Sequence, residues 1–322
     1  MPAPIPLLRL LSADHFISGA LIAEQLGISR ASVSNALADA EQYGIALERR
    51  HGLGYRLASP IEWLDAASIR AGLPADSALQ VEIVDRIEST NRALLADPRH
   101  GRVLTAEWQE GGRGRLGRKW LGALGGSLLF SVAWSFPGGL AQLAGLPLAV
   151  GASLAETLAA RGVNHIGLKW PNDLLLPEGK VGGILIEMQG DALGPAQVVI
   201  GIGINLSLPS HWQAQLNQPA ATLCGAGLAA SRNALFAQLL ADLESALRRF
   251  ADEGFSSFRS AWEARHAWRG AEVEARAPDG RVMVGVARGV ADDGSLRLDS
   301  LDGEILIHTG DISLRKRDES AA

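Results

Sequence analysis

The residues best suited to bind a charged ligand are concentrated in the segment GGRGRLGRKW, at positions 111–120. Its four cations alternate with glycines, and they are Arg113, Arg115, Arg118 and Lys119. Such cations repel one another, and a glycine-rich backbone is entropically costly to order. A bound anion offsets both costs, because guanidinium groups bind it with paired hydrogen bonds and glycine amides approach it closely. The segment therefore predicts a phosphate- or carboxylate-binding loop, with a solvated basic loop or a nucleic-acid patch as the alternatives.

The glycines of this segment also match a dinucleotide-binding fingerprint, Gly112-x-Gly114-x-x-Gly117. That fingerprint requires a helix directly after it. Here Trp120 instead leads through further glycines into SLLFSVAW (127–134), an apolar run with the length of a buried strand. The chain also has no GxxxxGK[ST] phosphate loop. Both standard nucleotide motifs are therefore excluded.

Three further segments carry polar groups that could face the same ligand. Ser89-Thr90-Asn91 opens the expected helix NRALLAD, after the strand-like run VEIVDRI. Two hydroxyls and an amide suit a neutral polar head group, but helix capping explains them equally well. In KWPNDLLL (169–176), a proline-rigidified turn presents Asn172 and Asp173. In EGKVGGILIEM (178–188), Lys180 precedes a buried strand, either as a surface residue or as a cation directed at the ligand.

Taken together, these segments resemble the biotin–protein ligases. The resemblance rests on STN (89–91), EWQEGGRGRLGRKW (107–120), KWPND (169–173), KxGGILIE (180–187) and GIGIN (201–205). With the N-terminal helices described below, the chain resembles the bacterial bifunctional biotin ligase and biotin-operon repressor over essentially its whole length. The arginine-rich loop and KWPND together are highly specific, whereas STN alone is not.

The resemblance implies a two-step reaction. The carboxylate of biotin attacks the α-phosphate of ATP with Mg²⁺, giving biotinyl-5′-adenylate and pyrophosphate. A lysine of the biotin carboxyl carrier protein domain of acetyl-CoA carboxylase then attacks the mixed anhydride. It further implies a cytoplasmic protein without a membrane partner, a ligand-dependent homodimer, and binding to biotin operator DNA.

The resemblance also assigns roles to individual positions. Lys180 and Arg115 are the expected catalytic residues. The expected biotin ligands are Ser89, Thr90, Asn91, Gln109, Arg113, Gly114, Arg115 and Lys180. The expected ATP ligands are Arg118, Asn172 and Asn205. The metal ligands stay unknown, and Cys224 has no assigned role. Leu116 stands where some repressor-type members carry another arginine.

The elements that position these residues begin with a helical unit at 1–59. Three helical stripes are predicted in PIPLLRLLSAD, SGALIAEQLGI and SRASVSNALADAEQYG, and two short strands follow around Gly52 and Gly54. The second and third stripes have helix-turn-helix spacing, with the strands as a wing. The expected DNA-binding residues are Ser29, Arg30, Ser32, Ser34 and Asn35. Five arginines are balanced by five acidic residues in this unit, so one copy should bind DNA weakly.

The rest of the chain predicts an α+β multidomain protein. A linker at 60–80, with a short helix in IEWLDAASIRAG, precedes a catalytic α/β domain at 81–268. The family resemblance makes this domain similar to class II aminoacyl-tRNA synthetases and biotin ligases. From 269 to 317 the apolar period changes to two, and Asp-Gly turns separate four expected strands. We interpret this region as an SH3-like β-barrel.

Composition limits the remaining possibilities. The 322 residues are about two domains' worth, and a net charge of −5 argues against a general nucleic-acid binder. The lone cysteine excludes an internal disulfide and suits a reducing cytosol. No signal peptide is evident. The uncharged stretch from Trp120 to Ala155 is interrupted by seven glycines and two prolines, which favours a core strand followed by a helix that is kinked or begun at Pro147.

Three alternative functions are considered. Lipoate or octanoate ligases share the catalytic fold, but the arginine-rich loop and KWPND argue against them. The chain could be a biotin-sensing transcription factor without catalysis, which would keep repression but not ligation. It could also be a ligase whose helix-turn-helix is only structural, which would keep ligation but not repression. A nucleic-acid-binding protein that uses the basic loop is disfavoured by the acidic net charge.

Overall fold

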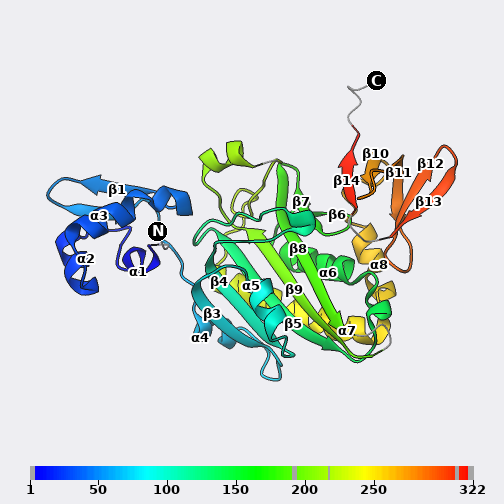
Figure 1. The fold of residues 1–322 in the computed structure, drawn as a ribbon, viewed down its shortest axis with the longest axis horizontal. Helices are drawn as coiled ribbons and strands as arrows, with labels where there is room; N and C mark the ends of the chain where they lie inside the picture. The colour runs from blue at the N-terminus through cyan, green and yellow to red at the C-terminus, as the bar shows by residue number, and fades with distance from the viewer. Residues whose placement is uncertain (1–3, 191–193, 217, 309–311, 318–322) are drawn as a thin grey trace.

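The computed structural model describes residues 4–190, 194–216, 218–308 and 312–317. Within these residues the strands form a two-stranded, a seven-stranded and a five-stranded sheet. The N-terminal helices and the five-stranded sheet lie at opposite ends of the seven-stranded sheet (Figure 1). The chain therefore has the α+β organisation expected from its sequence.

The N-terminal unit (residues 4–57) contains the predicted helix-turn-helix. Its elements are α1 Ile5–Leu8, α2 Gly19–Leu26, α3 Arg30–Ala38, the 3-10 helix η1 Ala40–Tyr43, β1 Leu47–Arg50 and β2 Gly54–Leu57. The hydroxyl groups of Ser18 and Ser29 cap α2 and α3, and Gly27 ends α2 with a positive φ of 64°. The first helix is shorter than predicted, and only four residues of its apolar stripe, Ile5–Leu8, are helical. The unit has its own buried cluster, which includes Ile22 and Val33.

The seven-stranded sheet has the order β3-β4-β5-β9-β8-β7-β6. Its strands are β3 Gln80–Ile87, β4 Arg102–Gln109, β5 Ser127–Phe136, β6 Gly167–Lys169, β7 Asp173–Leu176, β8 Gly179–Gly190 and β9 Ala196–Asn205. Only β3 and β4 pair in parallel, and every other neighbouring pair is antiparallel. The central strands β5 and β9 are almost wholly buried, as their continuous apolar runs predict.

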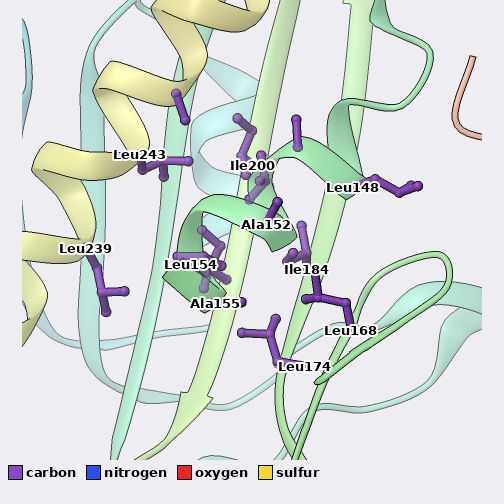
Figure 2. Packing of buried hydrophobic residues seen from close by; sticks show 14 of the residues in the cluster. Leu148, Ala152, Leu154, Ala155, Leu168, Leu174, Ile184, Ile200, Leu239 and Leu243 are labelled. Atoms are coloured by element: carbon purple, nitrogen blue, oxygen red, sulfur yellow. The ribbon is translucent and has the colours of Figure 1, made fainter. Parts of the chain in front are cut away.

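Helices cover both faces of this sheet. On one face lie α4 Ala66–Ala71, α6 Leu146–Ala160, α7 Arg232–Glu253 and α8 Ser256–Glu263, and on the other lies α5 Thr90–Ala96. Side chains from α6 and α7 meet those of β7, β8 and β9 in the main core (Figure 2). The stretch Leu140–Ala160, comprising the 3-10 helix η3 Leu140–Leu143 and α6, is long and apolar enough to cross a membrane. It is mostly buried in this core, and α6 begins at Leu146, one residue before the predicted start, so that Pro147 lies in its first turn.

The C-terminal region forms one antiparallel sheet of order β13-β12-β11-β10-β14. Its strands are β10 Glu272–Arg276, β11 Val282–Val290, β12 Leu296–Ser300, β13 Gly303–Ile307 and β14 Ser313–Lys316. The first four strands and their Asp-Gly turns were predicted from the sequence. The fifth, β14, was not, because only four residues with two consecutive exposed cations give a weak strand signal. Among the described strand pairings, none joins β13 to β14, so the sheet is not shown to close into a barrel.

Candidate active site

One cavity collects most of the predicted ligand-binding residues. It encloses about 1000 Å³, part of which is open to solvent. Its walls come from the start of α5, the turn between β6 and β7, strands β8 and β9, the start of β14, and the segment 113–120. The cavity therefore lies where the seven-stranded sheet meets both the cationic loop (residues 111–119) and the C-terminal sheet. We call it the ligand cavity.

A buried polar corner forms one end of the ligand cavity. Ser89, Thr90 and Asn91 are all less than 5% exposed. The Gln109 side-chain oxygen accepts hydrogen bonds from the Thr90 backbone amide at 2.8 Å and from its hydroxyl at 3.2 Å. The Ser131 hydroxyl lies 2.7 Å from the Thr90 hydroxyl and donates to Asn91 Oδ1 at 2.5 Å. This network fixes the orientation of the corner before any ligand arrives.

The backbone of β9 comes close enough to Asn91 that no side chain would fit there. A Cβ added at Gly201 would lie 2.1 Å from Asn91 Oδ1. Asn91 Nδ2 in turn donates to Glu187 Oε2 at 3.0 Å, and the Arg113 guanidinium pairs with Glu187 Oε1 at 3.1 Å. Glu187 thus connects the polar corner to the cationic loop.

A cluster of positive charge occupies the middle of the ligand cavity. Lys180 Nζ lies 2.6 Å from Asp173 Oδ1, and Lys169 Nζ lies 3.8 Å from the other oxygen of the same carboxylate. Burial, and then the nearby cations Lys180, Arg118 and Arg315, hold the pKa of Lys169 below its usual range, although Asp173 opposes this. A second anion in the cavity would relieve this repulsion between like charges.

Trp120 forms a flat wall beside these cations. A Cβ at Gly203 would lie 2.5 Å from its ring, so the indole packs directly on the backbone of β9. Lys180 Nζ lies 5.4 Å from the ring centroid. The indole Nε1 is buried, and it has no hydrogen-bond partner among the described residues. A buried donor at a cavity wall is suited to a ligand acceptor, because leaving it unpaired is costly.

Two arginines of the loop reach toward other walls. Arg115 Nη1 donates to Asn172 Oδ1 at 3.3 Å, while Asn172 Nδ2 donates to the Ile184 carbonyl at 2.8 Å. Arg118 Nη2 donates to the Ser313 hydroxyl on β14 at 3.4 Å. The loop therefore contacts both the KWPND turn and the C-terminal sheet.

The cationic loop is a short hairpin rather than the start of a helix. Arg113 and Lys119 form a β-bridge, and the Gly114 amide donates to the Arg118 carbonyl at 2.7 Å. A single 3-10 turn, η2 Arg115–Gly117, lies between them, with Leu116 at a φ of 57°. No α-helix follows, which confirms that the dinucleotide fingerprint is a false match.

No cluster of three or more metal-ligating side chains occurs within the described ranges. Asp173 and Glu187 supply carboxylates in or beside the ligand cavity, and each is already paired with a cation. Mg²⁺ commonly binds through one or two carboxylates and the phosphates of its substrate. The residues present therefore suit an ion that is held mainly by the phosphates of a ligand, and Asp173 is a carboxylate in the cavity that could assist.

Family models match three parts of the chain. The biotin/lipoate A/B protein ligase family matches residues 83–205, a helix-turn-helix domain matches 6–56, and the biotin protein ligase C-terminal domain matches 270–315. Bifunctional ligase/repressors called BirA from Salmonella typhimurium and Escherichia coli are 37% and 36% identical to the chain. The alignment with the Salmonella protein covers 97% of this chain and 97% of that protein, and the alignment with the Escherichia coli protein covers 98% of each. The chain belongs to the biotin protein ligase family.

Other members of the biotin protein ligase family match a smaller share of the chain. A biotin–[acetyl-CoA-carboxylase] ligase from Mycobacterium tuberculosis is 32% identical over 72% of this chain and 88% of its own length. The biotin protein ligase from Aquifex aeolicus, solved with biotin and ATP, has a TM-score of 0.63 and 30% identity, covering 74% of this chain and 99% of its own. Of these relatives, the two with a repressor name match the chain over nearly its whole length.

The structure places nearly all of the predicted ligand-binding residues around the ligand cavity. Those that line it are Ser89, Thr90, Asn91, Gln109, Arg113, Gly114, Arg115, Arg118, Asn172 and Lys180. Asn205 is the exception. It is buried behind the cavity, where its amide donates to the carbonyls of Lys180 and Ala221 at 3.4 and 3.3 Å. Its contact with the Lys180 backbone makes it a support of the site in this structure rather than a wall.

The predicted DNA-binding residues lie apart from the cavity, on the first turns of α3. Ser29, Arg30, Ser32 and Asn35 are exposed, and Ser34 is half-buried. Ser29 also caps the helix, because its hydroxyl accepts from the Ser32 amide at 3.0 Å. Their role in DNA binding stays a prediction.

Sequence reasoning missed several residues of the cavity. Trp120 stands inside the arginine-rich motif, and its aromatic ring was a usable signal, whereas Asp173 was named as part of the KWPND turn but was given no role. Glu187 ends the KxGGILIE motif and could have been noticed in the same way. Ser131 and Ser313 gave no signal, because they come from a buried strand and from an unpredicted strand.

Proposed function

We propose that this protein condenses biotin with ATP and transfers the biotinyl group to a lysine of a biotin carrier domain, and that it also represses transcription in response to biotin. The observation that carries the proposal is the ligand cavity. Six cations line it, and these are Arg113, Arg115, Arg118, Lys119, Lys169 and Lys180. Among the described residues, Asp173 is the carboxylate that lines the cavity, and Glu187 pairs with Arg113 beside it. A site with this charge balance suits a reaction between two anions.

The first step joins the carboxylate of biotin to the α-phosphate of ATP. A carboxylate oxygen bonds to phosphorus, the bond to the β-phosphate oxygen breaks, and pyrophosphate leaves. Lys180 and Arg115 are the proposed catalytic residues, because fixed cations stabilise the charge on both partners and on the leaving group. In the second step the carrier lysine attacks the anhydride carbonyl, so that an amide forms and AMP leaves. No side-chain nucleophile is required.

We assign biotin to the polar corner. Its ureido group is neutral and has both donors and acceptors, which the hydroxyl groups of Ser89 and Thr90 and the amide of Asn91 can match. Gln109 orients Thr90, and Arg113, Gly114, Arg115 and Lys180 lie along the path toward the carboxylate. ATP is assigned to the opposite end, near Arg118 and Asn172, with Asn205 supporting the backbone of Lys180.

Mg²⁺ would enter with ATP, and Asp173 is the residue placed to help hold it. When bound, the ion reduces the negative charge of the phosphates. The chain's own contribution is to hold Lys180 beside Asp173 at 2.6 Å, so that the lysine is correctly oriented as the phosphates bind.

The N-terminal unit is proposed to bind operator DNA as a ligand-dependent homodimer in the cytoplasm. We place the domain boundaries at 59 and 268, with a linker at 60–80, and we propose an SH3-like curvature for the C-terminal sheet. One observation favours a purely structural helix-turn-helix as the second candidate. Arg9, Arg49 and Arg56 are held by Asp85, by the Leu37 carbonyl and by Glu48. This leaves few cations for phosphate contacts.

The decisive experiment compares radiolabelled biotin with radiolabelled lipoate as substrates of the full chain, with ATP, Mg²⁺ and a purified biotin carrier domain. We expect biotin alone to be transferred, with release of one pyrophosphate per transfer. Pyrophosphate release excludes a sensor without catalysis, whereas transfer of lipoate in preference to biotin would overturn the substrate assignment. A carrier domain whose acceptor lysine is changed to arginine is the matched control, and it should not be labelled.

A further inference from the structure

Tyr43 of the N-terminal unit contacts the strand that leads into the cationic loop. Its ring packs edge-on against Trp108, with ring centroids 4.8 Å apart and planes at 72°. Trp108 immediately precedes Gln109, whose side chain holds Thr90 by two hydrogen bonds. Tyr43 therefore packs on Trp108, and the next residue of β4, Gln109, holds the polar corner of the ligand cavity.

The same part of the N-terminal unit also contacts the segment that leaves the loop. The Leu124 amide donates to the Tyr43 carbonyl at 2.9 Å. The Leu124 side chain is 2% exposed and belongs to the buried cluster of the N-terminal unit. A Cβ at Gly44, where φ is +83°, would lie 2.9 Å from the Ala123 side chain. Tyr43 and Gly44 thus contact both ends of the segment 108–124.

Holding both ends of a loop restricts the conformations of everything between them. The cationic loop is rich in glycine and in like charges, so ordering it over a ligand has a high entropic cost. We propose that Tyr43 is a positioning residue for the ligand cavity, because it fixes the two ends of the loop that closes over biotin and ATP. This inference rests on the proposed function for the identity of the ligands. By linkage, a ligand that orders the loop strengthens the packing of the N-terminal unit against it.

A second contact between the same parts of the molecule avoids the loop. Arg9 pairs with Asp85 on β3 at 2.7 Å and lies over the Trp63 ring at 4.3 Å. Neither partner belongs to the segment 108–124. Loss of this contact should loosen the N-terminal unit without freeing the ends of the loop, which makes Arg9 a matched control.

The experiment measures pyrophosphate release by the full chain for Tyr43→Ala, Tyr43→Phe and Arg9→Ala. We expect Tyr43→Ala to raise the KM for biotin and for ATP by about 2–10-fold, the range expected for loss of one aromatic pair. Its kcat at saturating substrate should stay unchanged, because the groups around the reacting atoms are untouched. Tyr43→Phe keeps the ring pair and should raise both KM values less than Tyr43→Ala does, and Arg9→Ala should behave as wild type.

Trypsin supplies a readout that a merely structural role would not move. Cleavage after Arg113, Arg115 and Arg118, with biotin and ATP present, should be faster in Tyr43→Ala than in wild type and unchanged in Arg9→Ala. Trp108→Leu removes the other ring of the pair, and it should reproduce both effects if Tyr43→Ala does not fold.

Three results would overturn the inference. They are unchanged KM values in a folded Tyr43→Ala protein, an equal rise in Arg9→Ala, or a fall in kcat alone. Failure of the wild-type chain to release pyrophosphate would instead count against the proposed function, so the two outcomes are distinguishable.

Discussion

The N-terminal unit and the ligand cavity both carry several cations, but they hold them in different ways. In the N-terminal unit, three of the five arginines are bound by Asp85, Glu48 or a backbone carbonyl. Arg30 and Arg50 have no ion pair among the described residues. In the cavity, six cations surround Asp173, and Glu187 pairs with one of them beside the cavity. The charges of the first region balance, so one copy should bind a polyanion weakly, whereas the second region has an excess of positive charge and is suited to a small anion.

The difference has a functional consequence for DNA binding. An N-terminal unit whose charges balance gains affinity for DNA when one dimer carries two copies of it. The second copy then binds at a high effective concentration. The ligand cavity, in contrast, has six cations along its walls within a single chain. If the ligand promotes the homodimer that we propose, it controls DNA binding through the number of units presented, without changing the DNA-contacting surface of either one.

The largest expected effect concerns this dependence on the ligand. Binding to DNA upstream of biotin-synthesis genes should tighten by about 10²–10⁴-fold when biotin and ATP are added, because two units then act together. A gel shift with and without the two ligands measures it, and analytical ultracentrifugation reports the accompanying dimer. Tight DNA binding without ligand would contradict the claim that a single N-terminal unit binds DNA weakly. Absence of binding in both conditions would leave the helix-turn-helix with a structural role only.

The next effect concerns the cavity alone. Lys180→Ala should slow adenylate formation by about 10²–10³-fold, by analogy with removal of a single transition-state donor, while biotin affinity changes far less. Pyrophosphate release and calorimetric biotin binding separate the two quantities. Lys316→Ala, at an exposed position of β14, is the control and should behave as wild type. Near-normal adenylate formation in Lys180→Ala would remove Lys180 from the reaction.

A third expectation concerns a buried histidine near the cavity. His266 stacks on Trp262 and pairs through its backbone with Leu168, and its ring nitrogens have no partner within the described part of the chain. Burial, and then the charge of Arg269, lowers its pKa to about 4, although Glu263 opposes this shift. The neutral ring suits a region that already holds excess positive charge.

The pKa of His266 predicts how stability depends on pH. Above about pH 6.5 the ring is neutral in both the folded and the unfolded chain, so it adds no slope. As the pH falls from 6.5 to 4, only the unfolded chain takes up the proton. The free energy of unfolding should therefore decrease by about 1.4 kcal/mol for each unit that the pH falls. Urea unfolding of wild type and His266→Leu measures this slope. Parallel pH dependence in the two proteins would contradict it.

The smallest effect tests the free cations of the N-terminal unit. Arg50 is the last residue of β1, beside the turn of the wing, where it is exposed and lies over the Phe16 ring at 5.1 Å. Arg50→Ala in the liganded dimer should reduce the slope of log K against log salt by about 1.8, since each lost phosphate contact accounts for about 0.9. Arg9→Ala should leave the slope unchanged. Equal slopes for wild type and Arg50→Ala would show that the wing does not contact phosphate.

Most of the fold could be predicted from local sequence signals. Ser18, Ser29 and Ser231 cap helices where the sequence indicates helix starts, and the Asp-Gly pairs turn between the C-terminal strands. These features depend on residues close together in the chain. The strand β14 and the helix α8 were missed, because each is short and is stabilised by distant partners such as β10 and α6.

The site could be predicted only as far as its motifs extend. Lys180 and Asn172 were found through their segments, but the ion pair that joins Lys180 to Asp173 depends on the register of β7 against β8. Asn205 was assigned to ATP from its motif, whereas its orientation behind the cavity depends on the residues around Ala221. Contacts between segments far apart in the chain, such as Arg118 with Ser313, have no local signal.

The wall contributed by β14 also determines when, during translation, a nascent chain can form the complete ligand cavity. Roughly 140 residues separate Lys180 from the end of that strand, and a ribosome needs roughly 7–28 s to add them at 5–20 residues per second. During this interval the polar corner and the cationic loop are already synthesised, but Arg118 still lacks its contact with Ser313. Chains that terminate early therefore lack one side of the cavity, and only a ribosome that has passed β14 releases a protein able to enclose its nucleotide.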